Sequence, residues 1–261
     1  MSVPSVIIID PTEQFPHLKN APIVEAIIDL RARVEADWKE SEITPALKRL
    51  LLDYPKKLSM TGLQPEFTFG LGVVPEGKSI DRGWTGVRCQ TEDGLQVAEF
   101  SRDGFMFARL RPYEDWGRLA GEALRLWRMF LDLGKPAEIQ RFGVRFINRI
   151  TLPARFVLLE DYLDPAPQGA RDLDLLFQHF LHQDIFGVPG HAYTIRMIRT
   201  IQPEPVPNPQ ASGIILDIDV FTTQSFEPEP QALEHRLTEM RWLKNKMFFG
   251  SITSKALEAF R

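Results

Sequence analysis

Residues 142–150 have the sequence FGVRFINRI, and this stretch decides how we expect the chain to fold. Side chains alternate between the two faces of a strand, so the parity of a residue assigns it to a face. One face of the strand expected over residues 138–153 is apolar and carries Phe142, Val144, Phe146, Ile150 and Leu152. The other face carries Arg141, Arg145 and Arg149, with Gly143 and Ile147. The pattern predicts a strand that is covered by helices on its apolar side only.

Two other predicted strands carry acids that could pair with these arginines. Residues 214–226 place Asp217 and Asp219 opposite apolar neighbours, and residues 21–34 place Glu25 on a polar face. If the three strands are neighbours, their polar side chains form cross-strand ion pairs that keep the face soluble. The alternative is that the same face is concave and serves as a recognition surface. Both interpretations are open at this point.

Asn148 does not fit the simple pattern, because its parity places an amide on the apolar face. A buried amide without a partner costs about 1–3 kcal/mol. We therefore expect Asn148 to hydrogen-bond a turn or a helix end where the strand finishes.

Turn and helix signals divide the rest of the chain. Asp93-Gly94 and Asp103-Gly104 each lie between alternating runs, a pattern typical of tight hairpins. The spacing of apolar residues predicts helices over 41–55, 113–136, 173–186, 228–249 and 251–260. Further strands are expected over 56–77, with an interruption at Pro65, and over 191–202, and an exposed proline-rich loop over 203–213.

This order of elements predicts an α+β protein with one large, curved antiparallel sheet and helices packed on one face. After an N-terminal extension over residues 1–20, a strand, a helix, a meander and a long helix occupy 21–136, and a similar order returns over 137–261. The two halves are expected to pack as one globular unit. An internal duplication would explain the repeated order, but the sequence leaves it open.

Composition limits the class of protein. The chain has 261 residues, a formal net charge of −4 and one cysteine, Cys89. The negative charge makes a nucleic-acid partner unexpected. A single cysteine and the lack of a basic, long apolar N-terminal stretch indicate a cytoplasmic protein without a membrane span. We expect Cys89 to be a buried structural thiol.

Signals for chemistry are weak. His179 and His182 would lie one turn apart on the predicted helix 173–186, a spacing that permits metal ligands but matches no strong signature. Asp217 and Asp219 alone are too few acids for a magnesium site. No phosphate-binding loop, dinucleotide fingerprint or nucleophile elbow is present in the sequence. We therefore predict no metal and no cofactor, and no catalytic residue can be named.

Four stretches together resemble a known family: LKNAPIVEAIIDLRA, FSRDGFMFARLRPYEDW, RFGVRFINRI and KNKMFFGSIT. They are similar to a sporadically distributed family of uncharacterised prokaryotic proteins, over roughly residues 16–260. The matching motif residues are Pro22, Glu25, Tyr113, Trp116, Arg141, Arg145 and Asn148. The resemblance implies no activity. The patchy occurrence of that family, which looks like that of mobile genes, implies a defence or stress context.

These observations favour a binding or regulatory protein that uses its charged sheet face or a dimer surface. The candidate ligand-binding residues are Arg141, Arg145, Arg149, Asn148, Asp217, Asp219 and Glu25. The expected partner is a protein, a small anionic ligand or a second copy of the chain. The alternative is a metal-dependent hydrolase acting on nucleotides or nucleic acid, which would require His179, His182, Asp217 and Asp219 to converge in one pocket.

Overall fold

The computed structural model describes residues 5–67, 77–153, 158–170, 173, 175, 177–203 and 212–261. Only the backbone is described for residues 63–67, 77–82 and 203. The strands are β1 Ile23–Arg31, β2 Lys56–Phe67, β3 Gly77–Gln90, β4 Gln96–Ser101, β5 Gly104–Leu110, β6 Arg141–Thr151, β7 Leu181–Gly187, β8 Thr194–Pro203 and β9 Ser212–Thr222. The helices are α1 Glu40–Leu50, α2 Trp116–Gly134, α3 Pro230–Phe249 and α4 Ser254–Glu258, with a 3₁₀ turn at Leu159–Asp161.

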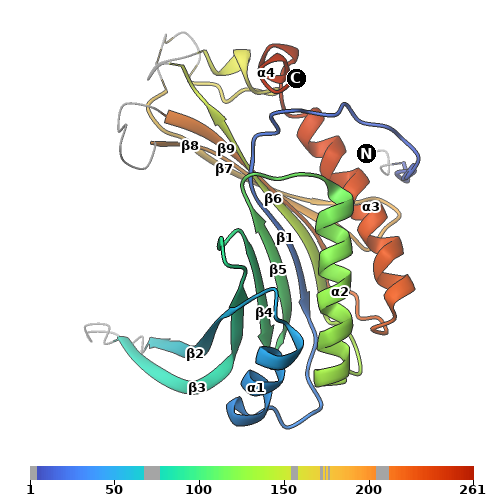
Figure 1. The fold of residues 1–261 in the computed structure, drawn as a ribbon. Coiled ribbons are helices and arrows are strands. Elements are labelled where there is room, and N and C mark those ends of the chain that lie inside the picture. Colours follow the sequence, from blue (N-terminus) through green and yellow to red (C-terminus); the bar gives the residue numbers. More distant parts are fainter. Residues whose placement is uncertain are drawn as a thin grey trace.

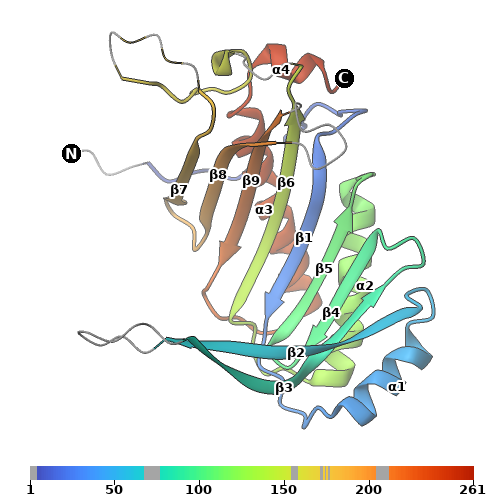
Figure 2. The same ribbon diagram turned by 90° about the vertical axis from the view of Figure 1, so that its left-hand side faces the viewer.

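The nine strands form one antiparallel sheet in the order β2-β3-β4-β5-β1-β6-β9-β8-β7. The sheet is open and curved, with α1, α2 and α3 packed against one face (Figure 1). The opposite face is concave, and we call it the hollow face. Figure 2 looks into that hollow, where the β2–β3 hairpin crosses in front of the lower end of the sheet. The predicted α+β class, the antiparallel sheet and the one-sided helices are confirmed.

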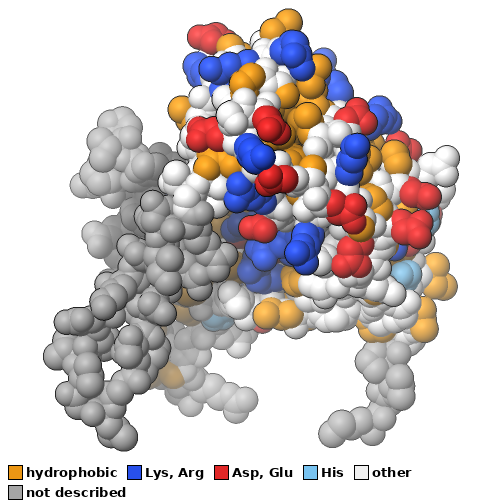
Figure 3. All heavy atoms as spheres, turned by 90° about the horizontal axis from the view of Figure 1, so that it is seen from below, with side chains coloured by type: hydrophobic (Ala, Val, Ile, Leu, Met, Phe, Trp, Pro, Cys, Tyr) orange, Lys and Arg blue, Asp and Glu red, His pale blue; other side chains and the backbone are white. Residues whose placement is uncertain are grey.

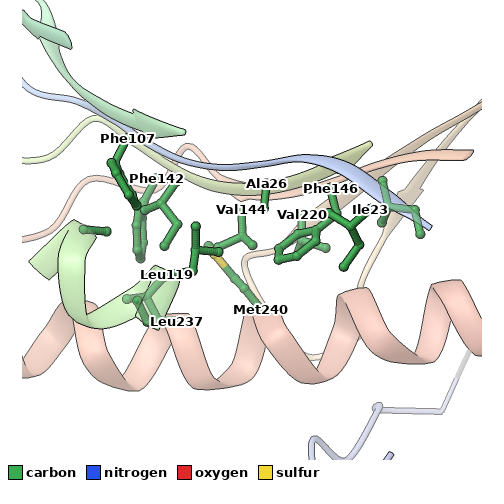
Figure 4. Close-up of a cluster of buried hydrophobic side chains, with 14 of the residues drawn as sticks. Ile23, Ala26, Phe107, Leu119, Phe142, Val144, Phe146, Val220, Leu237 and Met240 are labelled. Carbon is green, nitrogen blue, oxygen red and sulfur yellow. The ribbon is translucent and has the colours of Figure 1, made fainter. Parts of the chain in front are cut away.

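The core lies between the sheet and the two long helices (Figure 4). Phe142, Val144 and Phe146 are fully buried, as their parity predicts, and meet Leu237 and Met240 from α3 in the same cluster. Burying a large apolar side chain contributes about 1.5–3 kcal/mol. The alternation in β6 therefore fixes which face of the sheet receives the helices.

Glycines make the hairpins possible. Gly94 in the β3–β4 turn has a φ of 71° and Gly104 in the β4–β5 turn has a φ of 145°. Other residues avoid these positive angles because their Cβ clashes with the backbone. At Gly104 a Cβ would also lie 2.1 Å from the carbonyl oxygen of Leu30. Because glycine has no Cβ, β1 can pass close to this turn.

Helix α2 begins and ends at recognisable signals. The Asp115 carboxylate accepts a hydrogen bond of 2.9 Å from the backbone N–H of Arg118, which caps the N-terminus. At the other end Lys135 takes a left-handed φ of 44°, directly after Gly134. The helix predicted over 113–136 therefore ends at Gly134, and Lys135 is the residue that turns the chain.

The predicted helix over 173–186 is wrong. Residues 181–187 instead form the edge strand β7, which pairs along its whole length with β8. A short apolar run fits a helix and a strand about equally well, and here the hydrogen bonds of the neighbouring strand decide the outcome.

Two further predictions differ in detail. Strand β2 continues through Pro65, and its irregular pairing lies earlier, between Met60 and Leu63. Of the predicted loop 203–213, residues 204–211 lie outside the described residues, while Pro203 and Ser212 pair as the ends of β8 and β9. No helix in the described part of the chain is long and apolar enough to cross a membrane.

Candidate functional site

The face of the sheet opposite the helices carries the predicted cross-strand ion pairs. Arg145 on β6 makes two hydrogen bonds to the Asp217 carboxylate on β9, from Nε at 2.8 Å and from Nη2 at 2.6 Å. The hydrogen bonds that Arg145 donates to the Asp217 carboxylate raise the pKa of the Arg145 guanidinium, although partial burial opposes that shift. The two charges therefore satisfy each other.

A second group of charges lies beside this pair. Arg141 contacts Asp29 on β1 and lies 3.1 Å from Asp219, which also accepts a hydrogen bond of 2.9 Å from Arg196 on β8. Asp219 is 1% exposed, and burial raises the pKa of its carboxyl although the arginines oppose that shift. These contacts join four strands in one network.

Two more of the predicted residues, Glu25 on β1 and Arg149 on β6, lie on the same face of the sheet. Glu25 lies beside Ile147 across β1 and β6. Arg149 donates a hydrogen bond of 3.4 Å to the carbonyl oxygen of Gln202. The sheet face opposite the helices thus offers paired charges, and the lower end of the molecule likewise shows Lys and Arg side chains next to Asp and Glu side chains (Figure 3).

Asn148 lies on the helix side of the sheet and is 3% exposed. Its Nδ2 donates to the carbonyl oxygen of Leu216 at 2.9 Å. The acceptor therefore belongs to the neighbouring strand β9, and the prediction that Asn148 bonds a turn or a helix end is wrong. Strand β9 lies next to β6, so the nearest carbonyl that can satisfy the amide comes from the sheet itself.

A pocket of about 340 Å³ opens beside Asn148, on the helix side of the sheet. We call it the Lys244 pocket. Its walls are the N-terminal segment 11–18, the start of β1, residues 113–116 before and at the start of α2, and the end of α3. The residues used below are Glu13, Tyr113, Trp116, Asn148, Arg241 and Lys244.

The floor of the Lys244 pocket is aromatic. Tyr113 and Trp116 line it, and both rest on the fully buried Phe146: the Tyr113 ring packs edge-on against it with centroids 5.6 Å apart, and the Trp116 ring stacks on it at 6.4 Å. The Lys244 Nζ atom lies 4.1 Å from the centre of the Phe146 ring, and the Arg241 guanidinium lies 5.7 Å from the Trp116 ring. Two cations thus rest on one aromatic cluster.

Lys244 is partly buried, and its amine lacks a carboxylate partner within the described structure. Burial is the main cause that lowers the pKa of Lys244 to about 7, and the neighbouring Arg241 charge adds to it. An ordinary lysine has a pKa near 10.4. At neutral pH a large share of Lys244 therefore carries no proton.

The acids of the Lys244 pocket are engaged elsewhere. Glu13 accepts hydrogen bonds from Trp242 Nε1 at 2.7 Å and from Lys246 Nζ at 2.5 Å. Asp115 caps α2, and Glu114 pairs with Arg109 at 3.1 Å. The two cations therefore face the pocket without an acid of the described residues opposite them.

The structure separates the residues of the hydrolase hypothesis. His182 pairs with Arg199 across β7 and β8, on the helix side of the sheet, whereas Asp217 and Asp219 point to the hollow face. His179 lies before β7 and its Nδ1 is 3.0 Å from the carbonyl oxygen of Ile201. Within the described residues, no three His, Cys, Asp or Glu side chains gather as metal ligands would.

The cysteine agrees with its sequence interpretation. Cys89 is a free thiol that is fully buried in β3, and burial raises its pKa to about 11. A thiol that keeps its proton at neutral pH is a poor nucleophile. Cys89 therefore contributes packing to the core.

Sequence reasoning missed Lys244 and Arg241. A signal was available, because Lys244 follows Leu237 and Met240 at helical spacing and so falls on the apolar stripe of α3. The motif residues of the family resemblance gave a second signal. Tyr113, Trp116 and Asn148 come from three separate parts of the chain and all line the Lys244 pocket.

Comparisons of the chain with protein-family models, with curated protein sequences and with solved structures found no match. The geometry of the two faces is therefore the basis for the proposals that follow.

Proposed function

We propose that the protein binds a small anionic ligand in the Lys244 pocket. The observation that carries the proposal is the pair of cations, Lys244 and Arg241, on an aromatic floor without an opposing acid of the described residues. A carboxylate or phosphate would neutralise both cations and would accept hydrogen bonds from them. A concave site with a few convergent polar groups and a shifted pKa is typical of ligand sites.

The proposal is tested by binding of simple anions. We expect glycolate or inorganic phosphate at millimolar concentration to raise the melting temperature, because a ligand that binds only the folded state stabilises it. Lys244→Met and Arg241→Gln should each abolish the rise. The matched controls Lys48→Met and Arg49→Gln make the same charge changes on α1, away from the pocket, and should keep it. An equal rise in all five proteins would contradict the proposal.

The hollow sheet face is a second candidate, as a surface for a protein partner or for a second copy of the chain. Its support is its shape and the mixture of half-exposed Arg145 and Arg196 with apolar Ile27 and Ile198, since arginine is enriched at protein interfaces. The ion pairs weaken this candidate as an anion site, because a ligand would have to compete with Asp217 and Asp219. Native mass spectrometry of protein from its host would reveal a retained partner or a dimer.

The strand order supports the internal duplication as a hypothesis. The first strands of the two predicted halves, β1 and β6, pair at the middle of the sheet, and each is flanked by the last strand of its own half, β5 or β9. Each half then continues into a long helix, α2 or α3. Helix α1 and strand β2 lack counterparts among the described residues of the second half. We infer two related units that diverged at their outer edges.

The family resemblance and its defence or stress context stay a hypothesis of the same kind. Support comes from the way the motif divides: Pro22, Tyr113, Trp116 and Asn148 line the Lys244 pocket, and the other three motif residues, Glu25, Arg141 and Arg145, lie on the hollow face. The metal-dependent hydrolase receives no support from the geometry, because His182 lies on the sheet face opposite Asp217 and Asp219, and His179 bonds the carbonyl oxygen of Ile201.

A further inference from the structure

We propose that Lys244 forms a reversible imine with small aldehydes or ketones that carry a carboxylate or phosphate group. The inference rests on the proposed anion site and names the class of ligand that this site takes. It adds a covalent step to binding, because the amine that would attract the anion is also placed to attack a neighbouring carbonyl.

Lys244 is positioned to meet a small molecule in the pocket. The side chain leaves α3 toward the sheet, and its Nζ lies over the Phe146 ring at the edge of a pocket open to small molecules. The acids that line the pocket bond other groups, and no described carboxylate pairs with the amine. Lysines that act as nucleophiles are activated in this way, by a desolvating pocket or by a neighbouring cation.

Arg241 is placed to hold the anionic group of the ligand. It lies three residues before Lys244 and therefore on the same side of α3, about one turn away. A guanidinium binds a planar carboxylate through two parallel hydrogen bonds. In a compound that carries a carbonyl next to a carboxylate, Arg241 would hold the carboxylate while the carbonyl carbon faces Lys244 Nζ. The same cation adds to burial, the main cause, in lowering the pKa of Lys244.

The groups that line the pocket together with Lys244 come from each neighbouring element. They are Arg241 on α3, Glu13 and His17 on the N-terminal segment, Tyr113, Glu114 and Asp115 before α2, and the uncharged Asn148 on β6, while the uncharged Phe146 of β6 lies under the amine. Because the three acids have other partners, Arg241 is the charge that acts on the amine most directly. A protonation midpoint near pH 7 is therefore expected for the reactive amine.

The step is balanced without an oxidant or reductant. The lone pair of the neutral amine forms a bond to the carbonyl carbon, and the carbonyl oxygen takes up the proton that the nitrogen releases, which gives a carbinolamine. The carbinolamine then loses its hydroxyl group together with the remaining nitrogen-bound proton as water. The product is a carbon–nitrogen double bond that water can hydrolyse back.

Reductive trapping tests the inference on the full chain. The protein is incubated at pH 7 with glyoxylate and sodium cyanoborohydride, which delivers a hydride to the imine carbon and leaves a stable secondary amine. Peptide mass spectrometry then locates the carboxymethyl group. We expect Lys244 to be modified at least roughly tenfold faster than exposed Lys48, with a half-maximal rate near pH 7, because an ordinary lysine is almost fully protonated there.

The controls separate this inference from the proposed function. Glycolate has the same carboxylate without the carbonyl, so it should slow trapping by competition and form no adduct. Lys244→Arg should bind glycolate and trap nothing at that position. Stabilisation by glycolate with uniform modification of all lysines would overturn the imine and leave the anion site standing. No stabilisation by glycolate, together with uniform modification, would overturn both.

Discussion

At the scale of single residues, Lys244 gives the clearest link between position and charge. It is an amine on the inner stripe of a helix, above the fully buried Phe146 ring. Such a group lowers stability when it is protonated, because folding removes water from the charge. The chain tolerates this cost at the edge of a pocket, where a ligand could replace the lost water.

The pH dependence of stability should reveal this cost. The pKa of Lys244 is lowered to about 7 in the folded state, so between pH 7 and about pH 10.4 the unfolded chain binds more protons. Stability from this residue therefore rises with pH across that window, by at most about 1.4 kcal/mol per pH unit. Urea unfolding at pH 6.5 and pH 8.5 should show that Lys244→Met loses this rise, whereas Lys48→Met keeps it. The same slope in all three proteins would mean that Lys244 titrates like an exposed lysine.

The pair of Arg145 and Asp217 leads to a second prediction. Asp217 is 7% exposed, so Arg145→Met leaves a buried carboxylate without its two hydrogen bonds and should cost about 1–3 kcal/mol. In a double-mutant cycle with Asp217→Asn, the two residues should show a coupling of about 0.5–3 kcal/mol. Denaturant unfolding at neutral pH measures both values.

The more exposed pair of Arg88 and Glu99 is the matched control for that cycle. It is also a cross-strand pair on the hollow face, but the Arg88 side chain is 41% exposed, and Arg88→Met should cost only about 0–1 kcal/mol. An equally small effect at Arg145 would show that this arginine is not needed for stability and is free for a partner.

At the scale of elements, the two hairpin glycines differ in what their turns require. In Gly94→Ala the added Cβ has open space around it, but the alanine must take a positive φ. The variant should therefore lose about 1–2 kcal/mol of folding stability. Gly104→Ala meets the Leu30 carbonyl oxygen in addition and should cost clearly more, because β1 must move away from the turn. Thermal unfolding of both variants checks the order. A Gly104→Ala variant as stable as Gly94→Ala would show that β1 gives way without cost.

The hairpins, the long helices and the faces of β6 could be predicted because their signals are local. Asp-Gly turns specify a hairpin by themselves, and the alternation from Phe142 to Leu152 fixes a buried face whatever lies opposite. Strand β7 could not be predicted, because it is an exposed edge strand that pairs, within the described part of the sheet, with β8 alone. Its local spacing fitted a helix, and pairing with a distant strand outweighed that preference.

At the scale of the whole molecule, the same distinction separates the two candidate sites. The ion pairs of the hollow face could be foreseen, because parity within each strand places Arg145 and Asp217 on one side. The Lys244 pocket could not, because it forms where segments far apart in the sequence meet: the N-terminal segment, the start of α2, β6 and α3. No single segment contains its pattern; the signals in the sequence were the place of Lys244 on the apolar stripe of α3 and the motif residues that line the pocket, Pro22, Tyr113, Trp116 and Asn148.

The N-terminal segment joins these distant parts. It crosses the outer side of α3 and reaches the turn between β7 and β8, where the Ile7 N–H donates to the carbonyl oxygen of Pro189 at 3.0 Å (Figure 1). On the way Phe15 stacks on Phe249 with ring centroids 5.6 Å apart, and Glu13 bonds Trp242. The segment thus forms one wall of the Lys244 pocket and also holds the end of α3.

Removing these two contacts should therefore affect stability and binding together. We expect the double variant Glu13→Gln, Phe15→Ala to melt several degrees lower, since about 1 kcal/mol corresponds to roughly 2–4 °C in domains of 150–250 residues. Hydrogen exchange should become faster at the end of α3 and near Pro189, and glycolate should no longer stabilise the protein, because one wall of the pocket is released. Thr12→Ala, an exposed change in the same segment, should alter none of these. A variant that melts lower but still gains full stabilisation from glycolate would show that the anion is held by α3 and the sheet alone, without this wall.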